Sequence, residues 1–299
     1  MKHPRRLATL VLAAVIVAAA PAAAAAPVQA VDDAGHAVAL PAPARRIVSL
    51  APHATELLFA AGAGPHVVAV LKGSDAPAEA ARLPRIGDVA GLDLERIVAL
   101  SPDLVVTWPY TTPGQVALLR ERGIAVYMTD AHEPEDIARD LEALGVLAGS
   151  EATAAPAARM LRERAAAITR SRVGRKTVRV FYQVASAPIF TIGGGHLIDH
   201  ALARCGGVNV FGDTRVPAPQ VDVEAVLARR PDAIVAATAH AVRPAWLDEW
   251  SRWRELPAAR TQSLFVVDAD RLHRAGPRFV DGMADLCEAL DRARARLGG

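Results

Sequence analysis

A cluster of polar side chains near the C-terminal end of the chain has the residue types of a binding site. Asp270, Arg271, His273 and Arg274 lie within five positions, after the apolar segment 263–268. An arginine can clamp a carboxylate or stack on a flat ring, and a histidine can ligate a metal from one side of a ring. Because the chain has nine histidines, a solvated surface position for His273 is the more common alternative.

Aromatic side chains mark a second candidate, after the apolar segment DLVVTW (103–108). Trp108 ends this segment, and Pro109 and Tyr110 continue it as a loop. A tryptophan at the end of a strand often belongs to the core, but an aromatic that opens a loop is well placed to face a ligand. We therefore expect Trp108 to contact a ligand, and Tyr110 is a candidate only because it lies close to Trp108.

Two histidines and a glycine run have the spacing of catalytic motifs but lack the groups that these motifs need. His196 and His200 stand four positions apart, which places them on one helix face, a geometry that can bind zinc. Leu197 stands where a zinc peptidase has its glutamate base. The run 193–195 lacks the lysine of a phosphate-binding loop, and we interpret it as a tight turn that needs positive φ. We predict no catalytic residue and no metal site.

The candidate residues lie at the ends of segments in which two patterns alternate. Short apolar segments are typical of buried strands, and the segments between them have helical patterns. This alternation predicts an α/β fold of parallel sheets covered by helices, with ligands at the carboxyl ends of the strands. The predicted strands are 46–51, 103–108, 124–128, 178–184, 232–238 and 263–268; the predicted helices are 54–62, 93–100, 113–122, 196–204, 222–229, 244–254 and 277–296; the candidate loops are 72–77, 108–112, 188–195 and 270–277.

A run rich in Ala, Arg, Glu and Leu separates two series of strands. It begins at Ser150, a candidate N-cap, and Gly174 is a stop signal after it. A helix of about 20 residues spans about 30 Å, which is enough to connect two lobes rigidly. We therefore predict an N-terminal lobe at 45–149, a linking helix at 150–173 and a C-terminal lobe at 174–299.

An internal repeat places the same residue types in both lobes. The segment LDLERIVALSPDLVV (92–106) aligns without a gap to VDVEAVLARRPDAIV (221–235). In each copy an acidic residue, Glu95 or Glu224, lies in the first turn of a short helix, where the helix dipole favours it. The Pro-Asp pair that follows is a general way to end such a helix, whereas folding does not require the two glutamates.

The N-terminal residues have the layout of a secretory signal peptide. Lys2, Arg5 and Arg6 precede an uncharged apolar stretch and then a run of small residues, so we expect cleavage at about 26–30 and exclude 1–30 from the fold. A retained membrane anchor is the alternative, but it needs about 20 strongly apolar residues.

Charge and cysteine content agree with export. Without residues 1–30 the basic and acidic residues nearly balance, so neither nucleic acid nor an anionic membrane is an expected partner. Cys205 and Cys287 are the only cysteines, and they can pair in an oxidising compartment or stay as two separate thiols. Neither lies near the leader, so we expect a free protein with no lipid anchor.

Four stretches together resemble the receptors of ABC importers for metal complexes. They are RIVSLAPHATELLFAAGAG (46–64), LDLERIVALSPDLVVTW (92–108), CGGVNVFGDTRVPAPQVDVEAVLARRPDAIV (205–235) and RAGPRFVDGMADLCEAL (274–290). The chain resembles the helical-backbone class of periplasmic receptors, and within it the receptors for cobalamin. The resemblance covers nearly the whole mature chain and is more specific for the class than for the ligand. It implies two Rossmann-like α/β lobes, one long rigid helix between them, and a ligand in the cleft.

The resemblance also implies roles for single residues in the cleft. Trp108 matches a tryptophan that stacks on the ligand, and Phe190 matches a second contact position, for which core packing is an equal alternative. The Ser-Asp-x-Pro phrase of the family is present as Ser74, Asp75 and Pro77. We therefore include Asp75 among the expected ligand-binding residues.

The resemblance also has implications for a disulfide bond and for the partners of the protein. The resemblance implies a disulfide between Cys205 and Cys287, and it makes Glu95 and Glu224 docking residues that meet arginines on two permease subunits. We expect a periplasmic monomer without a cofactor that delivers cobalamin, or a related corrinoid, to an inner-membrane permease and its ATPase.

The sequence departs from the cobalamin receptors at several aromatic positions. These positions hold Gly73, Val89 and Ala218 here, and Arg271 replaces a further aromatic residue. Each lost aromatic face removes on the order of 1 kcal/mol of binding beyond area burial. Haem is therefore the first alternative ligand and a ferric siderophore the second. An exported metal-dependent hydrolase is a remote alternative, because the chain has no G-x-S-x-G motif.

Overall fold

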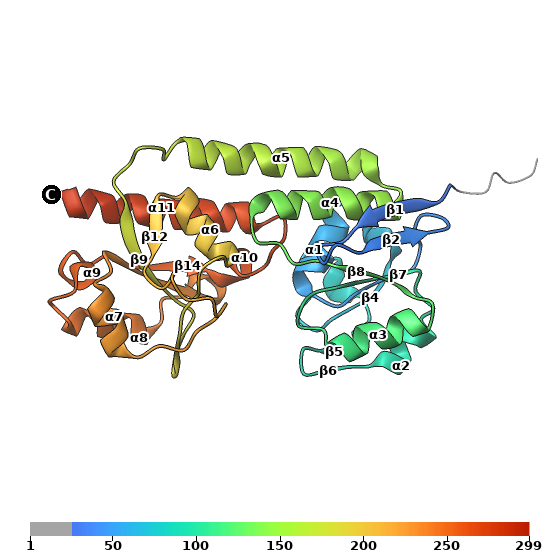
Figure 1. Ribbon diagram of the computed structural model, residues 1–299, viewed down its shortest axis with the longest axis horizontal. Helices are drawn as coiled ribbons and strands as arrows, with labels where there is room; N and C mark the ends of the chain where they lie inside the picture. The colour runs from blue at the N-terminus through green and yellow to red at the C-terminus, as the bar shows by residue number, and fades with distance from the viewer. Residues whose placement is uncertain (1–25, 299) are drawn as a thin grey trace, which may run out of the picture.

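The computed structural model describes residues 26–298 and shows two α/β lobes side by side, with one long helix along their common edge (Figure 1). The predicted fold class, two α/β lobes joined by a long helix, is confirmed. Residues 1–25, which hold most of the predicted signal peptide, lie outside the described residues. In the described range, no helix is both long and apolar enough to cross a membrane.

The N-terminal lobe is built on a four-stranded sheet in the order β4-β3-β7-β8. All neighbouring strands are parallel, and helices cover the sheet. The strands are β3 (Ile47–Ser49), β4 (Val67–Val70), β7 (Leu104–Thr107) and β8 (Ala125–Met128), and the helices are α1 (Pro52–Ala60), α2 (Leu94–Ala99), α3 (Pro113–Glu121) and α4 (Pro134–Ala148), with 3₁₀ turns η1 (Gly64–His66) and η2 (Ala80–Arg82).

The C-terminal lobe repeats this topology in a sheet of order β12-β9-β13-β14. In each lobe the second strand along the chain lies at the edge, beside the first strand. The strands are β9 (Val178–Gln183), β12 (Gly207–Asn209), β13 (Ala233–Thr238) and β14 (Leu264–Asp268), and the helices are α6 (Leu197–Arg204), α7 (Val223–Arg229), α8 (Ala245–Asp248), α9 (Pro257–Arg260), α10 (Ala269–Leu272) and α11 (Phe279–Gly298), with η3 (Ala239–Ala241) and η4 (Glu249–Arg252).

Three antiparallel hairpins, which the sequence patterns did not predict, complete the fold. They are β1 (Val28–Val31) with β2 (Ala37–Leu40), β5 (Gly87–Asp88) with β6 (Gly91–Leu92), and β10 (Ala185–Ser186) with β11 (Ile189–Phe190). Strand β1 packs against α4, and β2 packs near β8. The exclusion of residues up to 30 therefore removed a strand that belongs to the first lobe.

Each predicted strand is present, but α4 and the edge strands β4 and β12 had not been predicted. Helix α4 is amphipathic, because Ile137, Leu141 and Leu144 recur at helical spacing on its buried face. Its ends are also marked, by Pro134 in the first turn and by Gly149 at the C-cap with φ 66°. The predicted helix 244–254 is divided into α8 and η4, and the predicted loop 270–277 begins as α10.

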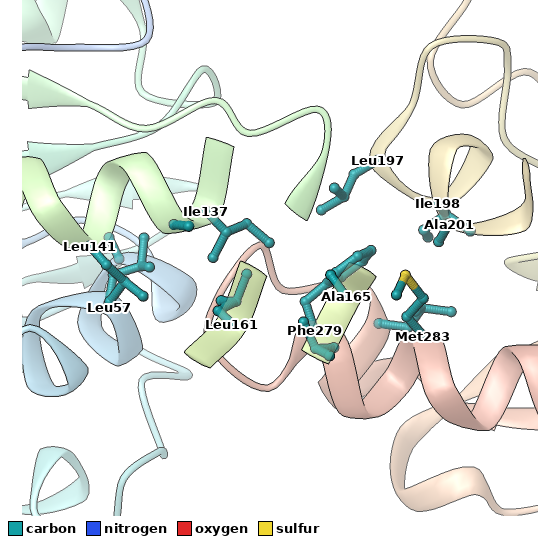
Figure 2. Packing of buried hydrophobic residues seen from close by; sticks show 14 of the residues in the cluster. Leu57, Ile137, Leu141, Leu161, Ala165, Leu197, Ile198, Ala201, Phe279 and Met283 are labelled. Atoms are coloured by element: carbon teal, nitrogen blue, oxygen red, sulfur yellow. The ribbon is translucent and has the colours of Figure 1, made fainter. Parts of the chain in front are cut away.

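The linking helix, α5 (Glu151–Arg170), packs on both lobes. Its buried side chains form one stripe, Ala154, Ala158, Leu161 and Ala165. Figure 2 shows Leu161 and Ala165 between residues of the two lobes: Leu57, Ile137 and Leu141 on one side, and Leu197, Ile198, Ala201, Phe279 and Met283 on the other. All of them belong to a single hydrophobic cluster, so the two lobes share one core.

Ser150 holds the start of α5 to the first lobe in an unexpected way. It occupies the N-cap position, but its side chain does not cap the helix. Instead its hydroxyl donates a hydrogen bond to the carbonyl oxygen of Ala61, over 2.6 Å. Ser150 is therefore the N-cap residue as predicted, but its hydroxyl fastens the linking helix to the end of α1 instead of capping it.

The disulfide between Cys205 and Cys287 is confirmed. It joins the C-cap of α6 to the middle of α11, and the two Cα atoms are 4.8 Å apart. Both residues are fully buried, and the bond closes a segment of 82 residues. It therefore fixes the last helix of the chain to the second lobe.

The close contact of α4 with α5 depends on Gly145, and this gives a prediction for stability. A Cβ at Gly145 would lie 2.3 Å from the Cβ of Ala154. We expect Gly145→Ala to lower the free energy of unfolding by about 1–3 kcal/mol through overpacking, measured by urea denaturation. The matched control is Gly114→Ala in α3, where a Cβ meets nothing within 4 Å. An unchanged midpoint for Gly145→Ala would contradict the packing described for the linking helix.

Candidate functional site

Trp108 follows β7 directly and forms an aromatic group with two neighbours. Its ring centroid lies 4.7 Å from that of Tyr110 and 5.3 Å from that of His53. Tyr110 is 74% exposed, whereas Trp108 is half-buried and packs partly against the shared core. The carboxyl end of a central strand therefore presents an aromatic surface that is open on the Tyr110 side.

His53, which the sequence analysis missed, supports Trp108 from inside the first lobe. It is buried in α1, and its Nε2 lies 2.9 Å from the hydroxyl of Thr129. Burial, together with the positive charge of Arg274, lowers the pKa of His53 to about 4. The imidazole is consequently neutral at pH 7, so it adds no charge beneath the aromatic surface.

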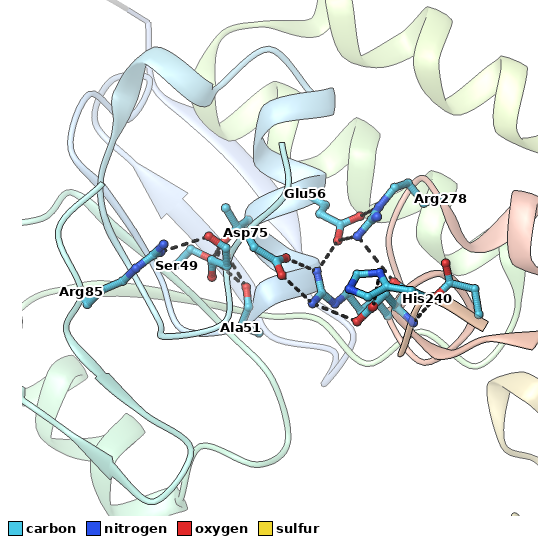
Figure 3. A network of polar contacts seen from close by, with 12 residues as sticks. Ser49, Ala51, Glu56, Asp75, Arg85, His240 and Arg278 are labelled. Carbon is cyan, nitrogen blue, oxygen red and sulfur yellow. Dashed lines mark hydrogen bonds and ion pairs between the residues drawn. The ribbon is translucent and has the colours of Figure 1, made fainter. Parts of the chain in front are cut away.

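A network of ion pairs bridges the two lobes and contains three of the predicted site residues. Arg274, in the second lobe, lies 2.6 Å from Asp75 and 3.2 Å from Glu56, both in the first lobe. It also lies 3.4 Å from Asp270. Figure 3 shows Glu56 and Asp75 of this network, with dashed lines to their partners. The structure thus brings Asp75, Asp270 and Arg274 together.

Glu56 is the centre of this network, although no sequence pattern singled it out. Its side chain is only 5% exposed and accepts hydrogen bonds from Arg278 over 2.6 and 2.8 Å. A carboxylate this deeply buried is tolerated only when it is paired and hydrogen-bonded. Arg278 and Arg274 meet this requirement from the opposite lobe, and the hydrogen bond from Arg274 also holds the pKa of Asp75 below its usual value.

Arg271 and His273 are not part of the inter-lobe network. Arg271 pairs with Asp285 of α11 over 3.3 Å and with Asp268 over 3.5 Å. The Nε2 atom of His273 lies 3.0 Å from the hydroxyl of Tyr182, on β9. Desolvation of its ring lowers the pKa of His273 to about 4, although the residue as a whole stays exposed. Its ring is therefore neutral at pH 7, with Nε2 engaged by Tyr182.

Phe190 lies on β11, in the second lobe. It is half-buried, pairs with Ala185 of β10 and forms an isolated bridge with Gln220. Three exposed positions hold small or aliphatic residues where the resemblance to cobalamin receptors led us to expect aromatic ones. They are Gly73, Val89 and Ala218.

A pocket of about 500 Å³ opens beside the ion-pair network, where the two lobes meet. Its volume lies within the usual range for sites that hold small molecules. Trp108, Tyr110 and Phe190 are not among its lining residues, which are Glu56, Phe59, Ala60, Ala76, Pro77, Glu79, Pro277 and Arg278. This pocket and the aromatic group at Trp108 are therefore separate features of the lobe junction.

The glycine run and the two histidines at 193–200 have structural roles. A Cβ at Gly193 would lie 2.1 Å from the carbonyl oxygen of Val216, and one at Gly194 would lie 2.2 Å from that of Gly212. Only Gly195 has positive φ, so close backbone approach explains the other two glycines. His196 is the N-cap of α6, and its Nδ1 accepts a hydrogen bond from the backbone N–H of Ile198 over 3.1 Å.

The sequence repeat forms the same structural unit in both lobes. Asp103 and Asp232 each accept a hydrogen bond from the backbone N–H of an arginine, Arg46 or Arg179, next to or within the first strand of the lobe. The same arginines donate from their side chains to the last carbonyl groups of α2 and α7, those of Leu100 and Arg229. These bonds explain the repeated aspartate.

Glu95 and Glu224 have no such role. Both are exposed in the first turn of their helices, while Asp93 and Asp222 cap α2 and α7 by accepting from the backbone N–H of Arg96 and Ala225. Within residues 26–298, neither glutamate forms an ion pair. Figure 1 shows α2 and α7 on the sides of the two lobes that face away from α5.

Similarity to known proteins extends over almost all of the described chain. Residues 47–271 match the model of the family described as periplasmic binding protein. The vitamin B12-binding protein of Vibrio parahaemolyticus is 35% identical over 258 residues, which cover 85% of this chain and 92% of that protein.

Solved structures give the same relationship. The crystal structure of the periplasmic vitamin B12 binding protein of Vibrio cholerae is 36% identical, with a TM-score of 0.78, and the match covers 84% of this chain and 98% of that one. The periplasmic heme-binding protein from Roseiflexus sp. RS-1 is 25% identical, with a TM-score of 0.72 and coverage of 83% and 99%. These relatives are binding proteins with the same two-lobed fold, and the chain belongs to the periplasmic binding protein family.

Proposed function

We propose that this chain is the substrate-binding component of an ABC importer and binds cobalamin or a related corrinoid between its lobes. The observation that carries the proposal is the similarity to a vitamin B12-binding protein over 85% of the chain at 35% identity. A periplasmic location is supported by the similarity to periplasmic binding proteins. It acts there without catalysis, and the ligand is its cargo.

The ligand contacts come from both lobes. Trp108 and Tyr110 offer a face for the flat macrocycle, and Phe190 approaches it from the second lobe. Asp75, Asp270 and Arg274 supply hydrogen bonds to the polar groups around the ring. Arg271 and His273 belong to the outer edge of this set, because their contacts, with Asp285 and Tyr182, lie outside the inter-lobe network.

Haem is the second candidate ligand, and one observation favours it. Three aromatic positions of the cobalamin receptors are occupied here by Gly73, Val89 and Ala218, so fewer rings are present to hold a corrinoid. The neutral imidazole of His273 has the protonation state that an axial ligand needs. To bind the iron of haem, His273 would have to give up its hydrogen bond with the Tyr182 hydroxyl.

The mature chain divides into a first lobe to residue 149, the linking helix at 150–173 and a second lobe from residue 174. We place the cleavage of the leader at the beginning of the range 26–30, because β1 starts at Val28 and a later cut would remove part of it. The protein is a monomer that delivers its ligand to the inner-membrane permease and its ATPase.

The ligand is tested by dialysis against cobalamin, haem and a mixture of ferric siderophores, followed by absorption spectroscopy. We expect the mature protein to retain one equivalent of cobalamin. Retention of haem alone would show that haem, not cobalamin, is the ligand. The protein would still be a substrate-binding component of an importer. Retention of none of the three would overturn the proposed function.

The role of Trp108 is tested by two substitutions. We expect Trp108→Ala to weaken cobalamin binding by roughly 1–3 kcal/mol, the scale of a buried aromatic anchor, as measured by titration calorimetry. Trp108→Phe, which keeps a ring, should restore most of the affinity. The melting temperature of the ligand-free protein should change little, and a large loss of stability with intact affinity would identify Trp108 as a core residue instead.

Glu95 and Glu224 are the proposed contacts to the permease, one in each lobe. Their helices are already capped by Asp93 and Asp222, so a capping role does not explain them. Exposed acidic side chains can form ion pairs with arginines of the partner and steer its association. Because α2 and α7 face away from α5 (Figure 1), both can touch one membrane-side surface together.

We expect the double variant Glu95→Ala, Glu224→Ala to bind cobalamin normally but to lose stimulation of ATP hydrolysis by the importer. Loss of the paired charges removes the contacts that steer and orient docking, and high salt should weaken the wild-type complex for the same reason. Glu163→Ala, an exposed glutamate of α5, is the control. Normal stimulation of ATP hydrolysis by the double variant would show that the two glutamates are first-turn residues of their helices and not docking contacts.

A further inference from the structure

An aromatic pocket on the second lobe is not used by the proposed ligand site. Three of the four tryptophans of the chain line it, Trp246 of α8, Trp250 of η4 and Trp253 after η4. The pocket is small, with a volume of about 60 Å³. Trp250 is buried in the core, whereas Trp246 and Trp253 are half-buried and form the rim.

The pocket is continuous with the proposed docking helix. Val223, the first residue of α7 and the neighbour of Glu224, lines one wall. Charged groups border the opening, where Arg252 lies 5.9 Å over the ring of Trp253 and pairs with Glu249 over 3.0 Å. A partner that reaches Glu224 therefore meets an apolar hollow with a charged rim directly beside it.

Hydrogen bonds connect both walls of the pocket to the β10–β11 hairpin, which carries Phe190. Gln183 accepts from the indole N–H of Trp250 over 2.8 Å and donates to the carbonyl of Ala185, on β10. The N–H of Val221, just before α7, donates to the carbonyl of Ile189 over 3.0 Å. The pocket is thus held between the docking helix and the β10–β11 hairpin.

We propose that this pocket receives an apolar side chain of the permease subunit that docks on the second lobe. The proposal rests on the docking function inferred for Glu224. Half-buried tryptophans next to a charged rim have the composition of an interface hot spot, in which an apolar anchor is surrounded by polar contacts. A pocket of this size can hold one apolar side chain. Because the hairpin forms a wall, the inserted group also presses on the strand that holds Phe190 against the ligand.

The test is the double variant Trp246→Ala, Trp253→Ala, with Trp250 left in place as part of the core. We expect its affinity for the permease–ATPase complex in lipid nanodiscs to fall at least about tenfold, measured by interferometry. Its affinity for cobalamin and its melting temperature should match the wild type. The control is Met160→Ala, which removes a 59% exposed apolar side chain from α5 and should change neither affinity.

The outcomes separate this proposal from the docking function on which it rests. A wild-type protein that does not bind the complex overturns docking itself, whereas equal binding by wild type and double variant overturns only the pocket. Loss of cobalamin binding in the double variant would assign the pocket to the ligand. A wild-type dimer that the double variant disrupts in sedimentation would assign it to a second copy. If the double variant melts early, Trp253→Leu replaces it, and unchanged binding by that variant contradicts the proposal.

Discussion

The buried stripe of α5 is the constraint on which the two-lobed arrangement depends. Ala154, Ala158, Leu161 and Ala165 pack against both lobes and make them parts of one hydrophobic cluster. Small side chains let α5 approach its neighbours closely. On the facing helix, α4, even a Cβ at Gly145 would collide with Ala154 of α5. Moving one lobe as a rigid body would expose this stripe to water, at a cost that scales with the apolar area exposed. The cleft is therefore held near one width.

The charge network acts on the same junction from a different side. Glu56 belongs to α1 of the first lobe, and both of its arginine partners belong to the second. Removing a partner from a buried carboxylate is expensive because the charge is left without compensation. The shared core limits how far the lobes separate, and the network limits how they rotate about the linking helix. Arg274 also takes part in the proposed ligand site, so scaffold and site share this residue.

The sequence predicted features that repeat along the chain and missed those that depend on its folding. Short apolar segments located β3, β7, β8, β9, β13 and β14, and the helical pattern of α4 was equally clear but was not recognised. Glu56 and Arg278 carry no such signal, because each lies in an ordinary segment and becomes special only when the lobes meet. Arg271 and Arg274 look alike in sequence, but Arg271 lies in α10 and Arg274 beyond its end, so one faces α11 and the other faces the first lobe. The edge strands β4 and β12 are as long as β7 and β3, so length does not explain why they were missed. Strand β4 (VVAV) is apolar and was overlooked, whereas β12 (GVN) contains glycine and asparagine, which are uncommon in strands.

The repeated unit of α2 and α7 has a consequence for the encounter with a transporter. The two helices start with the same capped turn and the same exposed glutamate, one in each lobe. After half a turn about the axis between the lobes, these two exposed glutamates exchange places. If the permease is itself a symmetric pair of subunits, two opposite orientations of the receptor end in equivalent complexes. Twice as many collisions then lead to capture, and the transporter does not need to distinguish one lobe from the other.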